Sequence, residues 1–168
     1  MKKTLFAACC YVLFILAGAP AAGATQPGGQ VDDKTRCPVC GMFVAKYEQW
    51  LTQLVVSEGK TESFDGVKDM MAYYFSPEKF GGPADLKAGR IFVKDYYSQE
   101  WIDGRKAFYV IGSDVYGPMG HELIPFEHRD AAENFLKDHR GTQIFGFDEI
   151  NEEIVEALRK GHTMKGAN

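Results

Sequence analysis

Two thiols and a thioether occur within six residues in the segment Cys-Pro-Val-Cys-Gly-Met, residues 37–42. Sulfur donors of this kind are soft ligands that select Cu(I), whereas hard cations prefer oxygen. Gly41 carries no Cβ and allows a tight bend, which would turn the side chains of Cys40 and Met42 toward one ion. The segment therefore predicts a Cu(I) site.

The same segment is compatible with two other uses of its cysteines. Cys-Pro-Val-Cys has the spacing of a thiol–disulfide redox motif, which depends on a lowered thiol pKa. Such a motif ordinarily lies between a strand and the following helix, whereas only a polar stretch precedes Cys37. A Cys37–Cys40 bond in a non-catalytic interaction domain is the other alternative, although so short a loop gains little entropy. Zinc is a minor expectation because the chain has no second cysteine pair, and His128 and His139 are too far apart on one predicted helix to share a face.

A second unusual segment, residues 112–121, places a methionine and a histidine in a loop with three glycines. Binding residues concentrate in loops that rigid strands position. Met119 lies between Pro118 and Gly120 and belongs to no apolar stripe, so we expect it to be a ligand, with His121 as an additional candidate. The plainer interpretations are a core-filling Met119 and a surface His121.

The other methionines and one further histidine are weaker candidates. Met70 and Met71 recur at helical spacing with apolar neighbours and are expected to pack in the core. His162 and Met164 follow the last predicted helix in a glycine-containing tail, which is more simply a disordered end than a docking or metal site. We keep His162 and Met164 as weak metal candidates.

The first 24 residues have the pattern of an export signal. Lys2 and Lys3 precede an apolar run over residues 5–17, and the small residues Ala22 and Ala24 fit cleavage after Ala24. The run is shorter than the about 20 apolar residues that span a membrane. We predict a signal peptide over residues 1–24 and a soluble periplasmic protein, with a retained membrane anchor as the less favoured alternative.

Removal of this signal changes the cysteine count and the charge. Cys9 and Cys10 would be lost, which leaves Cys37 and Cys40 in the mature chain. The basic residues fall from 19 to 17 against 23 acidic residues, so the net charge changes from −4 to −6. A surface with this balance disfavours binding to nucleic acid or anionic lipid.

The order strand–strand–helix–strand occurs twice in the remaining chain. The first unit has expected strands at 50–57, 61–64 and 91–93, with a helix over 67–74. The second has expected strands at 107–111, 123–126 and 143–145, a helix around 132–136, and a last helix over 148–160. We predict an α+β fold of two small units with antiparallel sheets. The expected organisation is a flexible tether (25–36), a first unit (37–98), a second unit (99–160) and a tail (161–168).

Three stretches together resemble the NosL family of nitrous oxide reductase accessory proteins: Cys40-Gly41-Met42, Tyr109 to Gly120 (YVIGSDVYGPMG), and Pro125-Phe126. The likeness covers about residues 36–147. It implies a periplasmic Cu(I) metallochaperone, not an enzyme, that supplies copper for the copper–sulfide centre of nitrous oxide reductase. The implied partners are that enzyme or its membrane-associated maturation machinery. The resemblance also implies two strand–strand–helix–strand domains similar to a domain of organomercurial lyase.

The resemblance assigns roles by position. Cys40 and Met42 match the family's Cys-Gly-Met, and Met119 matches its second-domain methionine, so these three are the expected metal ligands. Cys37 is a candidate either for binding the metal or for protecting Cys40 by oxidation, and His121 stays an additional candidate.

Family members are commonly lipoproteins with a lipid-bearing cysteine at the end of the signal peptide. In this sequence Leu16-Ala17-Gly18 is followed by Ala19 where that cysteine would stand. We therefore expect an unlipidated form without a lipid anchor.

Overall fold

The computed structural model of the chain describes residues 31–56, 60–86 and 89–161. Within these ranges the chain forms a four-stranded sheet of order β2-β1-β3-β4 and a three-stranded sheet of order β6-β5-β7, both antiparallel. The predicted α+β class with antiparallel sheets is confirmed. The predicted signal peptide, and the weak candidates His162 and Met164, lie outside the described residues.

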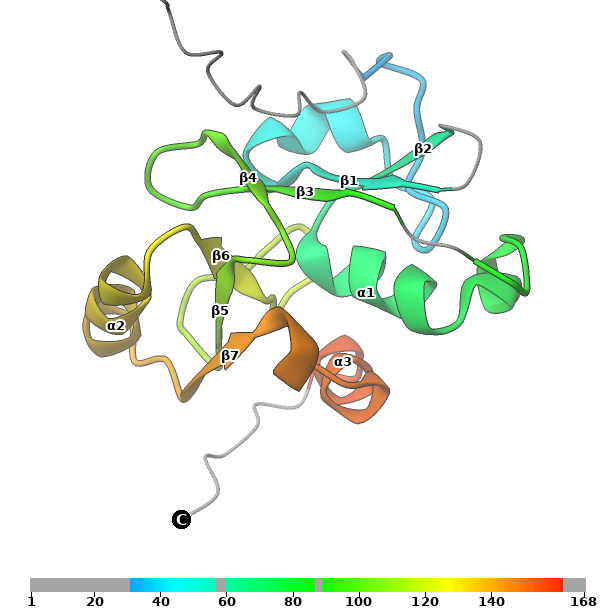
Figure 1. Cartoon of the computed structure of the whole chain (residues 1–168). Coiled ribbons are helices and arrows are strands. Elements are labelled where there is room, and N and C mark those ends of the chain that lie inside the picture. The colour runs from blue at the N-terminus through cyan, green and yellow to red at the C-terminus, as the bar shows by residue number, and fades with distance from the viewer. Residues whose placement is uncertain (1–30, 57–59, 87–88, 162–168) are drawn as a thin grey trace, which may run out of the picture.

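The elements of the first sheet and its neighbours follow the order of the chain. They are η1 (Val44–Trp50), β1 (Thr52–Val55), β2 (Thr61–Phe64), α1 (Val67–Phe75), η3 (Pro77–Phe80), β3 (Ile91–Lys94) and β4 (Trp101–Asp103). Figure 1 shows the η1 helix on one face of this sheet and α1 on the other. The sheet is therefore covered on both faces.

The second half of the chain supplies the other sheet and two more helices. Its elements are β5 (Phe108–Ile111), β6 (Ile124–Phe126), α2 (Arg129–Asp138), β7 (Gln143–Gly146), η4 (Phe147–Glu149) and α3 (Glu152–Arg159). Helix α2 packs on its own sheet, whereas α3 packs beside α1 of the first half (Figure 1). Helix α1 is therefore the element that the two halves share.

The apolar stripe that predicts α1 is buried as expected. Met70 and Met71 have no exposed surface, and they belong to one core that also holds Leu54 of β1, Tyr109 of β5 and Leu158 of α3. A smaller apolar cluster fills the space under α2. The expectation that Met70 and Met71 pack in the core is confirmed.

Strand β4 was not predicted. Its three residues are too few to show an alternating pattern, and it is formed because Ile102 pairs with Val93 of β3. The preceding turn is stabilised by Asp95, whose carboxylate accepts hydrogen bonds from the backbone N–H groups of Tyr97 and Ser98. The first sheet thus continues past the predicted boundary between residues 98 and 99.

Two other sequence predictions differ from the structure. The expected continuous helix over 148–160 is interrupted at Ile150, because the Asn151 side chain caps a new helix by accepting from Ile154 N at 3.0 Å. The end of the expected flexible tether is held by the domain, since Val31 packs against the core and Val44 N donates to Thr35 O at 3.1 Å. No helix in the described part of the chain is long and apolar enough to cross a membrane.

Candidate metal centre

The segment 37–42 folds into a tight loop that brings its ends together. Cys37 N donates to Met42 O, and Gly41 N donates to Cys37 O, both at 2.9 Å. Gly41 has φ +78°, in the left-handed region that side chains disfavour, and this is the bend expected from the sequence. Backbone geometry therefore fixes where the two cysteines lie.

Arg36 holds the outside of this loop. Its guanidinium donates to Gly41 O at 2.7 Å and lies 3.9 Å over the ring of Phe43. Arg36 and Phe43 also form an antiparallel bridge across the base of the loop. The loop is thus closed at both its base and its tip.

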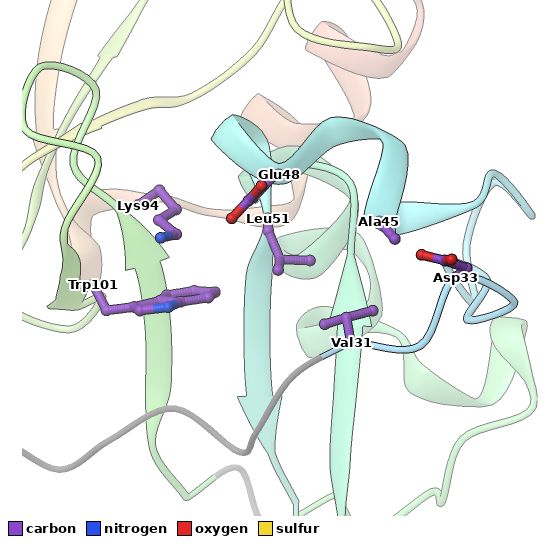
Figure 2. A pocket seen from close by; sticks show the side chains of 7 residues that line it. All are labelled: Val31, Asp33, Ala45, Glu48, Leu51, Lys94 and Trp101. Carbon is purple, nitrogen blue, oxygen red and sulfur yellow. The ribbon is translucent and has the colours of Figure 1, made fainter.

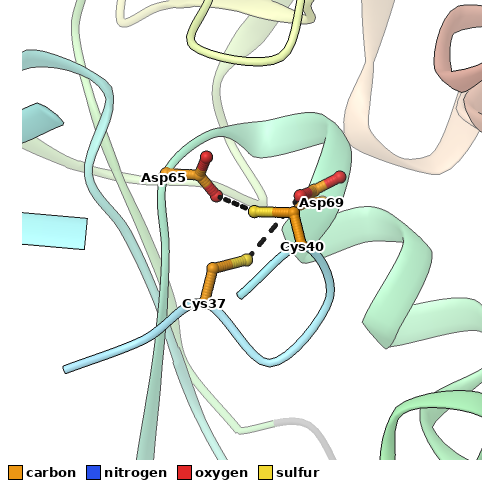
Figure 3. A group of neighbouring side chains, drawn as sticks. All are labelled: Cys37, Cys40, Asp65 and Asp69. Atoms are coloured by element: carbon orange, nitrogen blue, oxygen red, sulfur yellow. Dashed lines mark hydrogen bonds between the residues drawn. The ribbon is translucent and has the colours of Figure 1, made fainter. Parts of the chain in front are cut away.

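The start of α1 presents two carboxylates to the thiols. Asp65 lies just before the N-cap residue Gly66, and Asp69 lies in the first turn of α1. Cys40 Sγ donates to Asp65 Oδ1 at 3.2 Å, and Cys37 Sγ donates to Asp69 Oδ2 at 3.6 Å (Figure 3). One ligand atom of each of these four residues lies within 4.8 Å of the others. We call this group the Cys/Asp cluster.

The Cys/Asp cluster is largely removed from solvent. The exposed fractions of Cys37 and Asp65 are both 1%, while Cys40 is half-buried. Asp65 Oδ2 is buried and has no hydrogen-bond partner among the described residues. A buried carboxylate oxygen without a donor is costly, and a cation beside it would offset that cost.

Burial and the carboxylates together hold the thiols in their protonated form. Burial, with a smaller contribution from the neighbouring Asp65, raises the pKa of Cys37 to about 12. Burial raises the pKa of Cys40 well above its usual value, and Asp65 and Cys37 add to this shift. Burial also raises the pKa of Asp69. A metal ion that binds sulfur here must displace thiol protons.

The donor set contains both soft and hard atoms. The thiolate sulfurs suit Cu(I), and two sulfurs with two carboxylate oxygens also match the four-coordinate requirement of a borderline ion such as Zn²⁺. The sequence-based objection to zinc considered only cysteine and histidine as further ligands. Asp65 and Asp69 supply two oxygen ligands, so that objection does not hold.

The loop that carries Met119 lies between β5 and β6 and is closed by reciprocal hydrogen bonds between Gly117 and Gly120. The Met119 side chain is 49% exposed, so the interpretation of Met119 as a core-filling residue is wrong. His121 is half-buried, with its ring 5.0 Å from that of Tyr116, and is not a member of the Cys/Asp cluster. Met42 is half-buried.

The backbone of the Met119 loop reaches the same helix start as the cluster. Lys68, which lies between Asp65 and Asp69 in the sequence, donates from Nζ to Met119 O at 2.8 Å and to His121 O at 2.7 Å. The predicted second-half ligand is thus brought to the helix that backs the two thiols.

A pocket of about 250 Å³ lies on the opposite side of the first sheet from α1 (Figure 2). Within it, Lys94 Nζ lies 4.6 Å over the ring of Trp101 and donates to Gln99 O at 3.0 Å. The pocket contains no thiol and none of the predicted ligands. Its lining residues are Val31, Asp33, Ala45, Glu48, Leu51, Lys94 and Trp101.

The sequence of the chain matches a known protein family. Residues 28–155 match the family model NosL. The chain belongs to the NosL family. This confirms the resemblance drawn from the Cys-Gly-Met and Gly-Pro-Met-Gly segments.

Two curated NosL relatives are similar in sequence. The copper-binding lipoprotein NosL of Stutzerimonas stutzeri is 26% identical over 132 residues, which cover 74% of this chain and 66% of that protein. The copper-binding lipoprotein NosL of Achromobacter cycloclastes is 33% identical over 98 residues, or 55% and 50% of the two chains. The matches thus span between half and two thirds of the length of these relatives.

A solved NosL structure shares the fold. The crystal structure of the copper chaperone NosL from Shewanella denitrificans superposes with a TM-score of 0.64, covering 74% of this chain and 96% of that chain at 23% identity. The α+β fold with antiparallel sheets is therefore shared with a NosL structure.

Sequence reasoning missed the two aspartates of the cluster in this NosL-family chain. Asp65 and Asp69 look like ordinary acidic residues at a helix start, where carboxylates favour the positive end of the dipole. Their spacing gives no helical-face signal, because Asp65 precedes the N-cap Gly66 and only Asp69 lies in α1. Only the packing of a loop some 25 residues upstream shows what they face.

Proposed function

We propose that this chain is a periplasmic Cu(I) carrier that delivers copper for assembly of the copper–sulfide centre of nitrous oxide reductase. The observation that carries the proposal is the Cys/Asp cluster, in which a preformed loop holds two free thiols against two carboxylates. The proposed ligands are Cys40, Met42 and Met119. Cys37 and His121 are further candidates. The copper-binding names of the relatives support the choice of metal.

The protonated thiols allow Cu(I) to bind by a one-for-one exchange with a proton. When Cu(I) replaces the proton of Cys40, one positive charge leaves and one arrives, so the charge of the buried site is unchanged. A divalent ion at the same sulfur adds a charge unless a second proton leaves. Cu(I) binding at a single thiolate is thus charge-neutral, and the softness of Cu(I) matches the sulfur ligand.

The carboxylates give the displaced proton a path. Asp65 Oδ1 accepts a hydrogen bond from the Cys40 thiol at 3.2 Å. Cys40 is also the more exposed of the two thiols. Proton release and metal entry can therefore occur at the same side of the site. The half-exposed Met119 thioether, a weak neutral ligand, would then exchange with ligands of the acceptor.

The chemistry of the cluster disfavours the alternative of a thiol–disulfide oxidoreductase. Such enzymes need a thiolate, which requires a lowered thiol pKa, whereas burial and carboxylates raise the pKa of both cysteines. That alternative predicts reductase or isomerase turnover that requires Cys37 and Cys40 and ignores Met119. An interaction domain with a structural disulfide predicts neither turnover nor copper binding.

The partner and the cellular location are also proposals. Export is supported by the signal-like first 24 residues and by the lipoprotein names of the relatives. The proposed partners are nitrous oxide reductase or its membrane-associated maturation machinery, with no catalytic turnover by the carrier itself.

Delivery is tested by anaerobic transfer from the Cu(I)-loaded protein to copper-free nitrous oxide reductase in the presence of its maturation proteins. We expect copper to appear in the reductase faster than from an equal concentration of a small Cu(I) chelate. The Cys40→Ser variant, supplied with the same copper, should transfer no faster than the chelate. Copper that stays on the wild-type carrier would contradict the proposed delivery.

A further inference from the structure

Two ionisable side chains are buried where α1 meets the Met119 loop. Lys68 on α1 is 2% exposed, and Glu122, which follows the loop, is 3% exposed. Charged side chains at this depth are strongly destabilising unless their polar atoms are paired. The contacts they make therefore show which arrangement of the loop the fold favours.

The ammonium of Lys68 binds the backbone on both sides of Gly120. It donates to Met119 O at 2.8 Å and to His121 O at 2.7 Å. A loop conformation that moved these carbonyls away would leave the buried ammonium without these acceptors. The cost of burying Lys68 thus selects one backbone position for Met119.

Glu122 fixes the same junction from the other side. Its Oε1 accepts Lys68 N at 2.6 Å and Leu123 N at 2.9 Å, so it satisfies a first-turn N–H of α1. A Cβ on Gly66 would overlap the carboxylate of Glu122, so the close approach requires glycine there. The helix start and the loop are therefore joined by a matched pair of contacts.

We infer that Lys68 and Glu122 are positioning residues that set the Met119 ligand against the helix start carrying Asp65 and Asp69. The effect on Cu(I) binding rests on the proposed function. The contacts of Lys68 and Glu122 with the Met119 loop, which we call the clamp, are a property of the metal-free protein. It explains how a half-exposed methionine can serve a buried thiol site: its backbone is fixed while its thioether stays accessible.

The first test uses the metal-free protein. We expect Lys68→Met to increase amide hydrogen exchange across residues 117–123 while leaving exchange in β1 at the wild-type rate. Lys137→Met, at an exposed position on α2, is the matched control and should change neither region. Unchanged exchange across 117–123 in Lys68→Met would overturn the clamp, whether or not the protein binds copper.

The second test measures Cu(I) affinity by competition with a chromophoric chelator. Lys68→Met should weaken binding about tenfold, within the range of coupling between residues that share partners. In a Met119→Leu background the same substitution should have no further effect. An equal loss in both backgrounds would show a general structural effect and overturn the positioning role.

Glu122 provides the variant that keeps the test decisive if Lys68→Met folds poorly. Glu122→Ala removes the acceptor and should weaken Met119-dependent binding, whereas Glu122→Gln keeps an oxygen acceptor and should restore it. Failure of Glu122→Gln to restore affinity and exchange protection in 117–123 would contradict the inference. If the wild type binds no Cu(I), the proposed function fails, and the exchange measurement still decides on the clamp.

Discussion

The Cys37–Met42 loop and the Met119 loop are held in opposite ways. In the first, the thiol side chains are enclosed and bonded to the carboxylates of α1, and the fold acts directly on the ligand atoms. In the second, the fold holds the backbone through buried Lys68, while the Met119 side chain is 49% exposed. The contrast suggests a division of work, with a closed side that retains the ion and an open side that exchanges it.

The two loops also differ in the charge of their ligand atoms. The thiols titrate and can exchange a proton for a metal ion, whereas the thioether is neutral at every pH. Affinity should therefore depend mainly on the thiol loop, and access to the acceptor mainly on the Met119 loop. Four predictions test this contrast, and they begin with the largest expected effect.

Replacement of the more exposed thiol should be the most damaging change. Cys40→Ser should lower Cu(I) affinity by at least about 100-fold. This is more than is ordinarily lost when a residue that only hydrogen-bonds to a metal ligand is replaced. Chelator competition measures this, and the serine hydroxyl can keep the bond to Asp65, so folding should be preserved. Cys37→Ser is the comparison: an equal loss makes Cys37 a ligand, and wild-type affinity makes it a protecting thiol. Wild-type affinity in Cys40→Ser would contradict the proposal that the Cys37–Met42 loop retains the ion.

Affinity should rise with pH. Because burial raises the pKa of Cys37 to about 12 and that of Cys40 also well above its usual value, both thiols are protonated near neutrality and protons compete with Cu(I). Each thiol that binds should therefore strengthen binding about tenfold per pH unit, or about 100-fold between pH 6 and 8. The measurement is chelator competition corrected for the chelator's own protonation. Affinity independent of pH would refute the exchange of protons for copper.

Loss of the thioether should have a moderate effect on affinity and little on stability. Met119→Leu should weaken Cu(I) binding about tenfold, less than loss of the thiolate, because a thioether is a weak ligand. Its melting temperature should stay near wild type, since the side chain is half exposed. Met71→Leu is the matched control: this fully buried methionine should change stability by less than about 1.5 kcal/mol and leave affinity unchanged. Equal affinity losses in the two variants would remove the distinction between ligand and core methionines.

The smallest effect is expected from the glycine that bends the thiol loop. Gly41→Ala should destabilise the protein by about 1–2 kcal/mol through its left-handed backbone, and should also weaken Cu(I) binding by displacing Cys40. Gly81→Ala tests the strain alone, because Gly81 has φ +76° against +78° and, like Gly41, open space around its missing Cβ. Both variants should lose similar stability in chemical denaturation, and only Gly41→Ala should lose affinity. A matching affinity loss in Gly81→Ala would assign the effect to global destabilisation.

Local patterns predicted the parts of the molecule that depend on nearby residues. The stripe that includes Met70 and Met71 places α1, and Gly41 indicates the bend in the thiol loop, because both signals arise within one turn of chain. Element boundaries were less accurate where a short strand or a cap decides them, as at β4 and Asn151.

The rest of the site depends on packing between distant segments. The thiols meet Asp65 and Asp69 across separations of 25 and 32 residues, and Lys68 reaches the Met119 loop across 51. In sequence all three look like ordinary polar residues of an amphipathic helix, whose exposed face they would be expected to occupy. One sequence supplies no signal for such contacts.

The central claim is that sulfur from both loops binds one Cu(I) ion. Copper X-ray absorption on protein labelled with selenomethionine tests this directly, because selenium marks only the methionines. We predict a copper site with thiolate sulfur and with selenium neighbours, and a loss of selenium scattering in Met119→Leu beyond any loss in Met71→Leu. A site with no selenium neighbour, or one whose selenium scattering is the same in wild type and Met119→Leu, would contradict the account.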